Sequence, residues 1–261
     1  MCDDPGIQGP DPGAEASAAD SGARPPALRA PEEFDPSWIL FHGNGLLAVD
    51  KPAGLPMHRG TAHERGLAEL IDGWVRMHPG TLDVRPGRPI RPVHRLDLEA
   101  TGVALFALTR RIAAVVEEAF AAGQVKKKYL AVVAGPVEAL GCIRGAVRAR
   151  FRGEYRRVPA ELTFRRLQGD ERLSLVEVVP GGGRTHQIRQ LFARAGRPLA
   201  GDFRYGKPTP SRQFLYRFQV ASFLLHALEV TLPPEVLGAA KTIRAEIPET
   251  FRRLIREKWG K

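Results

Sequence analysis

The sequence has 261 residues, a net charge of +10 at neutral pH and two cysteines. This length supports one large or two small domains with a real core, and Cys2 and Cys142 are too few for a disulfide framework or a cysteine-built zinc site. The sequence contains no apolar run long enough to cross a bilayer and does not start with a secretory signal, so we expect a cytoplasmic protein without a membrane partner.

The charge is unevenly distributed along the chain. Residues 1–35 contain eight acidic residues and two arginines and are rich in Pro, Gly, Ala and Ser, whereas the remainder has a net charge of +16. We expect residues 1–35 to form a disordered acidic tail and residues 36–261 to form one catalytic domain. A basic, arginine-rich body indicates a polyanionic partner, with nucleic acid as the first candidate. Arginine usage in high-GC genomes would explain the preference for arginine over lysine, but it would not explain the excess of basic over acidic residues.

The first predicted elements form a hairpin. Residues 38–41 and 46–49 are apolar and flank Gly43-Asn44-Gly45, a typical hairpin turn. Apolar residues at helical spacing predict helices at residues 66–77, 111–122 and 185–195, the last capped by Thr185, and a final helix opens at Pro248. Further strands are predicted at residues 103–108, 125–133, 158–167, 173–179, 222–232 and 241–247. Many hairpin-linked strands with few helices indicate an α+β fold with a mixed, largely antiparallel central sheet and flanking helices.

Asp97 is the first candidate site residue, because it lies where a polar loop meets the buried strand 103–108. The basic neighbours Arg91, His94 and Arg95 would keep its carboxylate ionised, as a nucleophile requires. On local grounds alone, a turn acid that accepts backbone hydrogen bonds is the more common explanation of Asp97, with Thr101-Gly102 closing the turn.

Two further segments carry possible site residues. Tyr129 follows three lysines at the start of a strand, where its ring could stack on a base, although a half-buried strand tyrosine is an ordinary feature. Gly181-Gly182-Gly183-Arg184 leads into the helix at 185–195, whose first turn and arginines would bind an anion. Arg184 there could hold a phosphate or the Asp97 carboxylate. The glycine spacing matches neither a P-loop nor a dinucleotide fingerprint, and the seven histidines show no paired metal-ligand spacing.

Four separate blocks, in order and in register, resemble the RluA-type RNA pseudouridine synthase family over residues 38–258. The blocks are VDKPAGL at 49–55, HRLDLEATG at 94–102, KKYLAVVAG at 127–135 and GRTHQIR at 183–189. The resemblance implies the pseudouridine synthase fold with a catalytic cleft, and an isomerase that converts a specific uridine in structured ribosomal RNA or tRNA to pseudouridine. It implies no cofactor and no metal, and we expect a monomer.

The resemblance also implies a role for each candidate residue. Asp97 would be the catalytic carboxylate, Arg184 its ion-pair partner, and Tyr129 the ring under the uracil that takes part in the late proton transfer at C5. The target base must flip out to reach Asp97, and Arg95 would fill the vacated space. The residues expected to contact RNA phosphates are Lys51, Lys127 and Arg189.

Ala100-Thr101-Gly102 departs from the family's usual Thr-Ser-Gly, so the position of the hydroxyl is in question. The family's small accessory RNA-binding module does not precede the catalytic body, which favours branches that recognise tRNA or ribosomal RNA with the catalytic domain alone. Two other functions fit parts of the sequence. A non-catalytic RNA-binding or RNA-folding protein would explain the basic body, and a carboxylate hydrolase would need Glu99 as a second acid.

Overall fold

The structure, a computed structural model, describes residues 29–60, 65–82, 84, 90–151, 153–206, 218 and 222–260. Most of the predicted acidic tail, residues 1–28, lies outside the described residues. Phe34 at its end is buried, and its ring lies 5.6 Å from that of Trp38 and 5.3 Å from that of Trp74. Folded contacts therefore begin two residues before the first helix, at Pro36.

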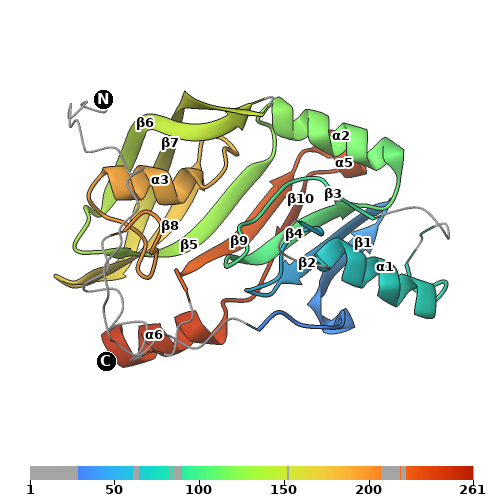
Figure 1. The fold of residues 1–261 in the computed structure, drawn as a ribbon, viewed down its shortest axis with the longest axis horizontal. Coiled ribbons are helices and arrows are strands. Elements are labelled where there is room, and N and C mark those ends of the chain that lie inside the picture. Colours follow the sequence, from blue (N-terminus) through green and yellow to red (C-terminus); the bar gives the residue numbers. More distant parts are fainter. Residues whose placement is uncertain are drawn as a thin grey trace. The chain divides into compact units, whose positions relative to one another are not determined.

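The chain divides into two compact units, and the boundary falls inside strand β5 (Lys126–Ala134), after Tyr129. The aspartate unit, which contains Asp97, comprises Leu28–Tyr129 and Leu225–Glu249. The arginine unit, which contains Arg184, comprises Leu130–Leu224 and Thr250–Lys261 among the described parts of the chain. Each unit contains its own run of paired strands, and Figure 1 labels their elements.

The strands of the aspartate unit are ordered β1-β2-β4-β9, with β3 paired to β4 and β10 paired to β9. All of these pairs are antiparallel except β4 with β9, which is parallel. The strands are β1 (Ile39–Gly43), β2 (Leu46–Lys51), β3 (Arg91–Pro92), β4 (Thr101–Ala107), β9 (Leu225–Leu232) and β10 (Lys241–Arg244). The helices are η1 (Pro36–Trp38), α1 (Leu67–Met77), α2 (Arg110–Ala121) and α5 (Pro234–Leu237).

The predicted hairpin is present, with Asn44 at φ 52° and Gly45 at φ 79° in its turn. The left-handed conformation at both positions matches the twist of the two strands, which is why Asn and Gly are suited to this turn. β2 then pairs with β4 along its whole length, from Leu46 opposite Ala107 to Lys51 opposite Gly102. The first block of the sequence is thereby aligned with the strand that follows Asp97.

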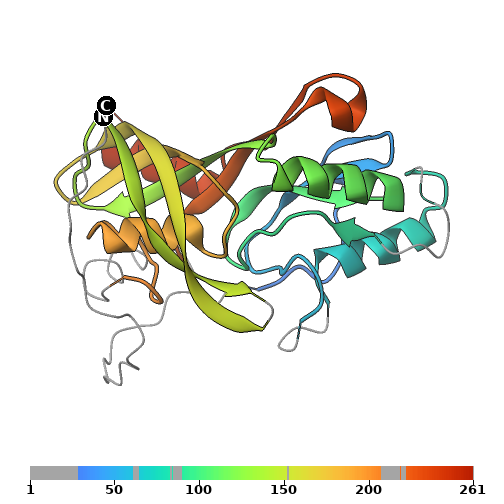
Figure 2. The ribbon, with the colours of Figure 1, turned by 90° about the horizontal axis from the view of Figure 1, so that it is seen from above.

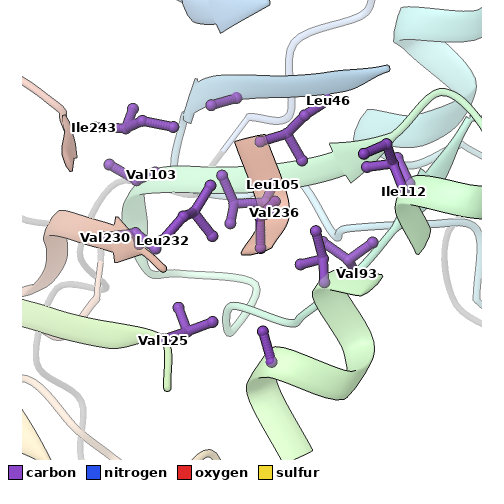
Figure 3. Packing of buried hydrophobic residues seen from close by; sticks show 14 of the residues in the cluster. Leu46, Val93, Val103, Leu105, Ile112, Val125, Val230, Leu232, Val236 and Ile243 are labelled. Atoms are coloured by element: carbon purple, nitrogen blue, oxygen red, sulfur yellow. The ribbon is translucent and has the colours of Figure 1, made fainter. Parts of the chain in front are cut away.

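The core of the aspartate unit lies between these strands and the helices α2 and α5 (Figure 3). Leu46, Val103 and Leu105 of the strands and Val116 of α2 are fully buried. Burying each such side chain contributes about 1.5–3 kcal/mol relative to leaving it in water. The strands that hold the Asp97 loop are thus anchored in the best-packed part of the unit.

The strands of the arginine unit are ordered β5-β8-β7-β6. β6 (Leu140–Phe151), β7 (Glu154–Gly169) and β8 (Leu173–Pro180) form antiparallel pairs, and α3 (Gln187–Arg194) packs on β6 and β7. α6 (Glu249–Trp259) is held by an ion pair between Lys258 and Asp170, 3.0 Å apart. β6 was not among the predicted strands, and β7 is longer than expected.

The predicted α+β fold class is confirmed. Both units combine helices with strands, and most of the strand pairs are antiparallel. The predicted cap of α3 is wrong. The residue before its first turn is His186, at φ 53°, and not Thr185. Along the described part of the chain, no helix combines the length and the apolar character needed to cross a membrane.

Candidate active site

Asp97 lies in a short loop between β3 and β4 that is fixed at both ends. At its start, the amide of Val93 donates to the carbonyl of Leu105 at 3.1 Å. At its end, the amide of Ala100 donates to the carbonyl of Asp97 at 3.2 Å, which closes a turn. This hydrogen bond uses the backbone carbonyl of Asp97. The side chain of Asp97 is half-buried, as a reactive group on a rigid support would be.

Lys51 is hydrogen-bonded to this loop through its side chain. Its side chain is fully buried, and its ammonium donates to the carbonyls of Pro52 at 2.8 Å, Leu98 at 3.0 Å and Ala100 at 2.8 Å. A lysine ammonium has three donor hydrogens, so these contacts use all of them. The predicted phosphate contact of Lys51 does not fit this geometry, and we correct its role to positioning the segment after Asp97.

Burial lowers the pKa of Lys51 to about 7, while the negative charges of Asp97 and Glu99 act in the opposite direction. The Asp97 carboxylate is therefore within electrostatic reach of a buried ammonium on the neighbouring strand. This cation lies in the same unit as Asp97 and was not predicted to be its neighbour.

Tyr129, at the start of β5, belongs to the same unit. Burial is the main cause that raises the pKa of its hydroxyl above the usual range, and the charge of Asp97 raises it further. The hydroxyl is therefore neutral at physiological pH. The structure thus places Asp97 within electrostatic reach of both Lys51 and Tyr129.

His94 does not supply the positive charge that was expected beside Asp97. Burial, with the charge of Lys127 as a second cause, lowers the pKa of His94 to about 4. Its Nε2 accepts a hydrogen bond from the amide of Leu105 at 2.9 Å, and its ring stacks on Phe120 with centroids 5.4 Å apart. His94 is thus a neutral structural residue. Arg95, next in the chain, is exposed, and its predicted role as a wedge stays a prediction.

The departure at Ala100-Thr101-Gly102 has a clear structural consequence. The hydroxyl of Thr101 shares a hydrogen bond of 2.8 Å with Nδ1 of His226 on β9. Gly102 has φ +104°, and a Cβ there would overlap the backbone of Ala227. The hydroxyl therefore ties β4 to β9 at the point where the Asp97 loop ends.

His226 was missed as part of this region. It is fully buried, and burial lowers its pKa to about 4, so the ring is neutral at physiological pH. The signal for it was the segment Leu225-His226-Ala227, a histidine inside an apolar strand. Sequence alone does not show that this strand is parallel to β4.

Arg184 precedes α3 in the arginine unit, and its side chain is exposed. Its amide donates to Oε1 of Gln187 at 3.1 Å, and Nε2 of Gln187 donates to the carbonyl of Glu161 at 2.9 Å. The amide of Gly181 donates to the same carbonyl at 2.9 Å. The glycine turn is therefore fixed to β7. The pairing of Arg184 with Asp97 stays a prediction.

Arg189 is buried and does not face outward as a phosphate ligand would. Its Nε and Nη2 donate to the two carboxylate oxygens of Asp202 at 2.7 and 2.9 Å. Its guanidinium also stacks on the ring of Phe223, 4.0 Å from the centroid. The predicted phosphate contact is corrected to a structural role, in which Arg189 anchors α3.

Lys127 is half-buried, with its ammonium 5.7 Å from the ring centroid of Phe120. Burial lowers its pKa. Its predicted phosphate contact stays a prediction. Among the described residues, no group of three or more histidine, cysteine, aspartate or glutamate side chains gathers as metal ligands would.

Comparison with known proteins places this arrangement in a family. The family model described as RNA pseudouridylate synthase matches residues 45–194, which include Lys51, Asp97, Tyr129 and Arg184. The tRNA pseudouridine synthase C of Vibrio vulnificus is 28% identical over 240 residues, which cover 83% of this chain and 93% of the relative. The ribosomal large subunit pseudouridine synthase C of Buchnera aphidicola is 28% identical over 230 residues, 82% of this chain and 68% of the relative.

The fold is also found in solved structures. Human RNA pseudouridylate synthase domain containing 4 superposes with a TM-score of 0.67 at 24% identity, over 84% of this chain and 92% of that one. This likeness shows the shared fold. The match of the family model covers more than half of the chain. The chain therefore belongs to the RNA pseudouridylate synthase family, a family of isomerases, which confirms the family and enzyme class that its motifs predicted.

Proposed function

We propose that the protein isomerises a specific uridine in a structured RNA, a ribosomal RNA or a tRNA, to pseudouridine, with Asp97 as the catalytic carboxylate. The observation that carries this proposal is the environment of Asp97. Its loop is fixed by Lys51 through Leu98 and Ala100, and its charge acts on both Lys51 and Tyr129. A reactive group held this way has the preorganisation that catalysis requires.

The reaction breaks the bond between C1′ of the ribose and N1 of the uracil, turns the base and joins C1′ to C5. N1 gains a proton and C5 loses one, so no oxidant, reductant or cofactor takes part. The target base must leave its stack to reach Asp97. Arg95 is exposed in the same loop, two residues before Asp97, and would occupy the space that the base leaves.

Tyr129 would stack under the uracil and assist the loss of the C5 proton. Because its pKa is raised, the hydroxyl is neutral at physiological pH. It would therefore act as a relay: its oxygen would accept the C5 proton while its own O–H proton passes to the Asp97 carboxylate, so that Tyr129 stays neutral before and after the transfer. Arg184 would pair with Asp97 and keep it ionised. Lys127 would contact a phosphate of the flanking RNA, which gives affinity without reading the sequence.

The non-catalytic alternative is not favoured, because a protein that only binds RNA has no need of Asp97, Tyr129 and Arg184 together. Both substrate classes remain in the proposal, since the similar relatives include synthases named for tRNA and for the large ribosomal subunit.

Transcriptome-wide pseudouridine mapping, with and without the protein, tests the proposal and identifies the target. We expect at least one site in tRNA or ribosomal RNA to disappear without the protein and to return with the wild type but not with Asp97→Asn. A map that does not change on loss of the protein would remove the support for catalysis.

A further inference from the structure

The hairpin formed by β6 and β7 is strongly basic. The two strands contain seven arginines and two glutamates. They pair over the whole length of β6, from Leu140 opposite Arg165 to Phe151 opposite Glu154. Figure 2 shows them as a long twisted pair in yellow-green. None of these arginines belongs to the blocks that identify the family.

Most of the arginines share one face of the hairpin. Residues directly opposite each other in an antiparallel pair lie on the same face, and successive residues alternate between faces. Arg148 lies opposite Arg157, and Arg150 lies opposite Tyr155. We call this the arginine face; its members are Arg144, Arg148, Arg150, Arg157, Arg165 and Tyr155.

The other face of the hairpin is the buried one. Val147 and Leu162 on it are fully buried. Phe164 on the same face lies 5.6 Å from Phe192 of α3, measured between ring centroids. The arginine face therefore points away from α3, and all five of its arginines are exposed.

Two arginines of this face form ion pairs near the base of the hairpin. Nearer the base, Arg144 pairs with Glu161 at 3.1 Å, and Arg165 pairs with Glu177 of β8 at 3.4 Å. In the tip half, the arginine face has three arginines, and neither glutamate of the hairpin lies there: Glu161 is nearer the base and Glu154 is on the opposite face. The side chains concerned are Arg148, Arg150 and Arg157.

An aromatic side chain is held among these arginines. Tyr155 is 58% exposed, although it is a large aromatic residue. The guanidinium of Arg148 lies 4.1 Å from its centroid, which supports one side of the ring. The opposite side of an exposed ring is a surface on which an unpaired base stacks.

We propose that the arginine face binds the sugar–phosphate backbone of the RNA substrate and that Tyr155 stacks on an unpaired nucleotide beside it. Alternate residues of a strand lie about 7 Å apart, so Arg148 and Arg150 present two guanidinium groups in a row. Guanidinium groups bind phosphate with paired donors. No large aliphatic side chain accompanies the three arginines at the tip, which favours a phosphate backbone over an apolar protein or lipid surface. This inference rests on the proposed function, because that function makes RNA the partner.

The test compares two triple variants that each remove three exposed arginines. One is Arg148→Ala with Arg150→Ala and Arg157→Ala. Truncating Arg148 spares its contact with α3, because Gln190 bonds to the backbone amide and carbonyl of Arg148 at 2.8 and 3.1 Å. The control removes three exposed arginines of the aspartate unit, which are Arg76, Arg110 and Arg111.

Binding of the substrate RNA is measured over a series of salt concentrations. Each lost phosphate contact reduces the slope of log affinity against log salt by about 0.7–0.9, so we expect the hairpin variant to lose about 2–3 in slope and the control less than half as much. Tyr155→Ala is expected to weaken binding at least about fivefold without changing the slope. Equal effects of the two triple variants, or unchanged binding in the hairpin variant, would overturn the inference.

The same samples separate failure of this inference from failure of the proposed function. A wild-type protein that forms pseudouridine, with a hairpin variant that binds RNA at full strength, contradicts only the role of the hairpin. A wild-type protein that forms no pseudouridine in any tRNA or ribosomal RNA contradicts the proposed function itself.

Discussion

Lys51→Met separates the positioning role of Lys51 from a phosphate contact. The wild-type ammonium donates to three carbonyls. Two of them, those of Leu98 and Ala100, belong to the turn that begins at Asp97. Methionine has a similar volume but no hydrogen-bond donors. The loop therefore keeps its packing but loses the hydrogen bonds from the ammonium. A displacement of about 1 Å at a reacting group lowers a rate about 10²-fold. We expect kcat to fall by that order, with the affinity for RNA and its salt slope unchanged.

The pH dependence of stability gives an independent readout for the same variant. Burial lowers the pKa of Lys51 to about 7, so between pH 7 and 10.5 the unfolded chain binds a proton that the folded protein does not. The stability of the wild type therefore rises with pH across this window relative to Lys51→Met. The full difference is on the order of 5 kcal/mol.

The assays are single-turnover kinetics on the substrate RNA and urea unfolding at a series of pH values. Lys126→Met is the matched control, because Lys126 is exposed at the start of β5. Unchanged turnover with weaker and less salt-dependent RNA binding would refute the positioning role and restore Lys51 as a phosphate ligand. Parallel stability curves for the wild type and Lys51→Met would refute the lowering of the Lys51 pKa by burial.

Three further substitutions test the supports of the site. Gly102→Ala places a methyl group against the backbone of Ala227 at a positive φ, so we expect a loss of stability of at least about 2 kcal/mol and a lower Tm. Asp202→Ala leaves the guanidinium of Arg189 buried without its carboxylate, and urea unfolding should show a loss of about 3–5 kcal/mol. Tyr129→Phe keeps the ring but removes the hydroxyl; we expect normal RNA binding with a turnover reduced at least about 10²-fold, measured in a single-turnover assay.

The local elements of the fold could be predicted from the sequence because their signals are local. The Asn44-Gly45 turn, the apolar stripe of α2 and the continuous apolar run of β4 each appear within a short window. β6 has no such signal. Its arginines alternate with glycine, alanine and valine, and it becomes a strand only through its pairing with β7 and the packing of α3.

The candidate site shows the same division. Asp97, Tyr129 and Arg184 stand out by their position in motifs, and nothing in the described structure argues against their roles. Lys51 and Arg189 were expected from the family resemblance to contact RNA phosphates, but both are buried. Their actual partners lie 47, 49 and 13 residues away, at Leu98, Ala100 and Asp202.

A buried cation is recognised only when its distant acceptors are known, so residue type alone points to the wrong role. Thr101 illustrates the opposite case. Its displacement from the family pattern was visible in the sequence, but its partner, His226, lies 125 residues further along the chain.

The most direct test of the central claim is pseudouridine formation by purified Asp97→Asn on the RNA that mapping identifies. Asparagine keeps the size of the side chain and removes the charge, so the loop held by Lys51 is preserved. We predict that this variant binds the RNA with wild-type affinity and forms no detectable pseudouridine. Pseudouridine formation at the wild-type rate would contradict the assignment of Asp97 as the catalytic carboxylate.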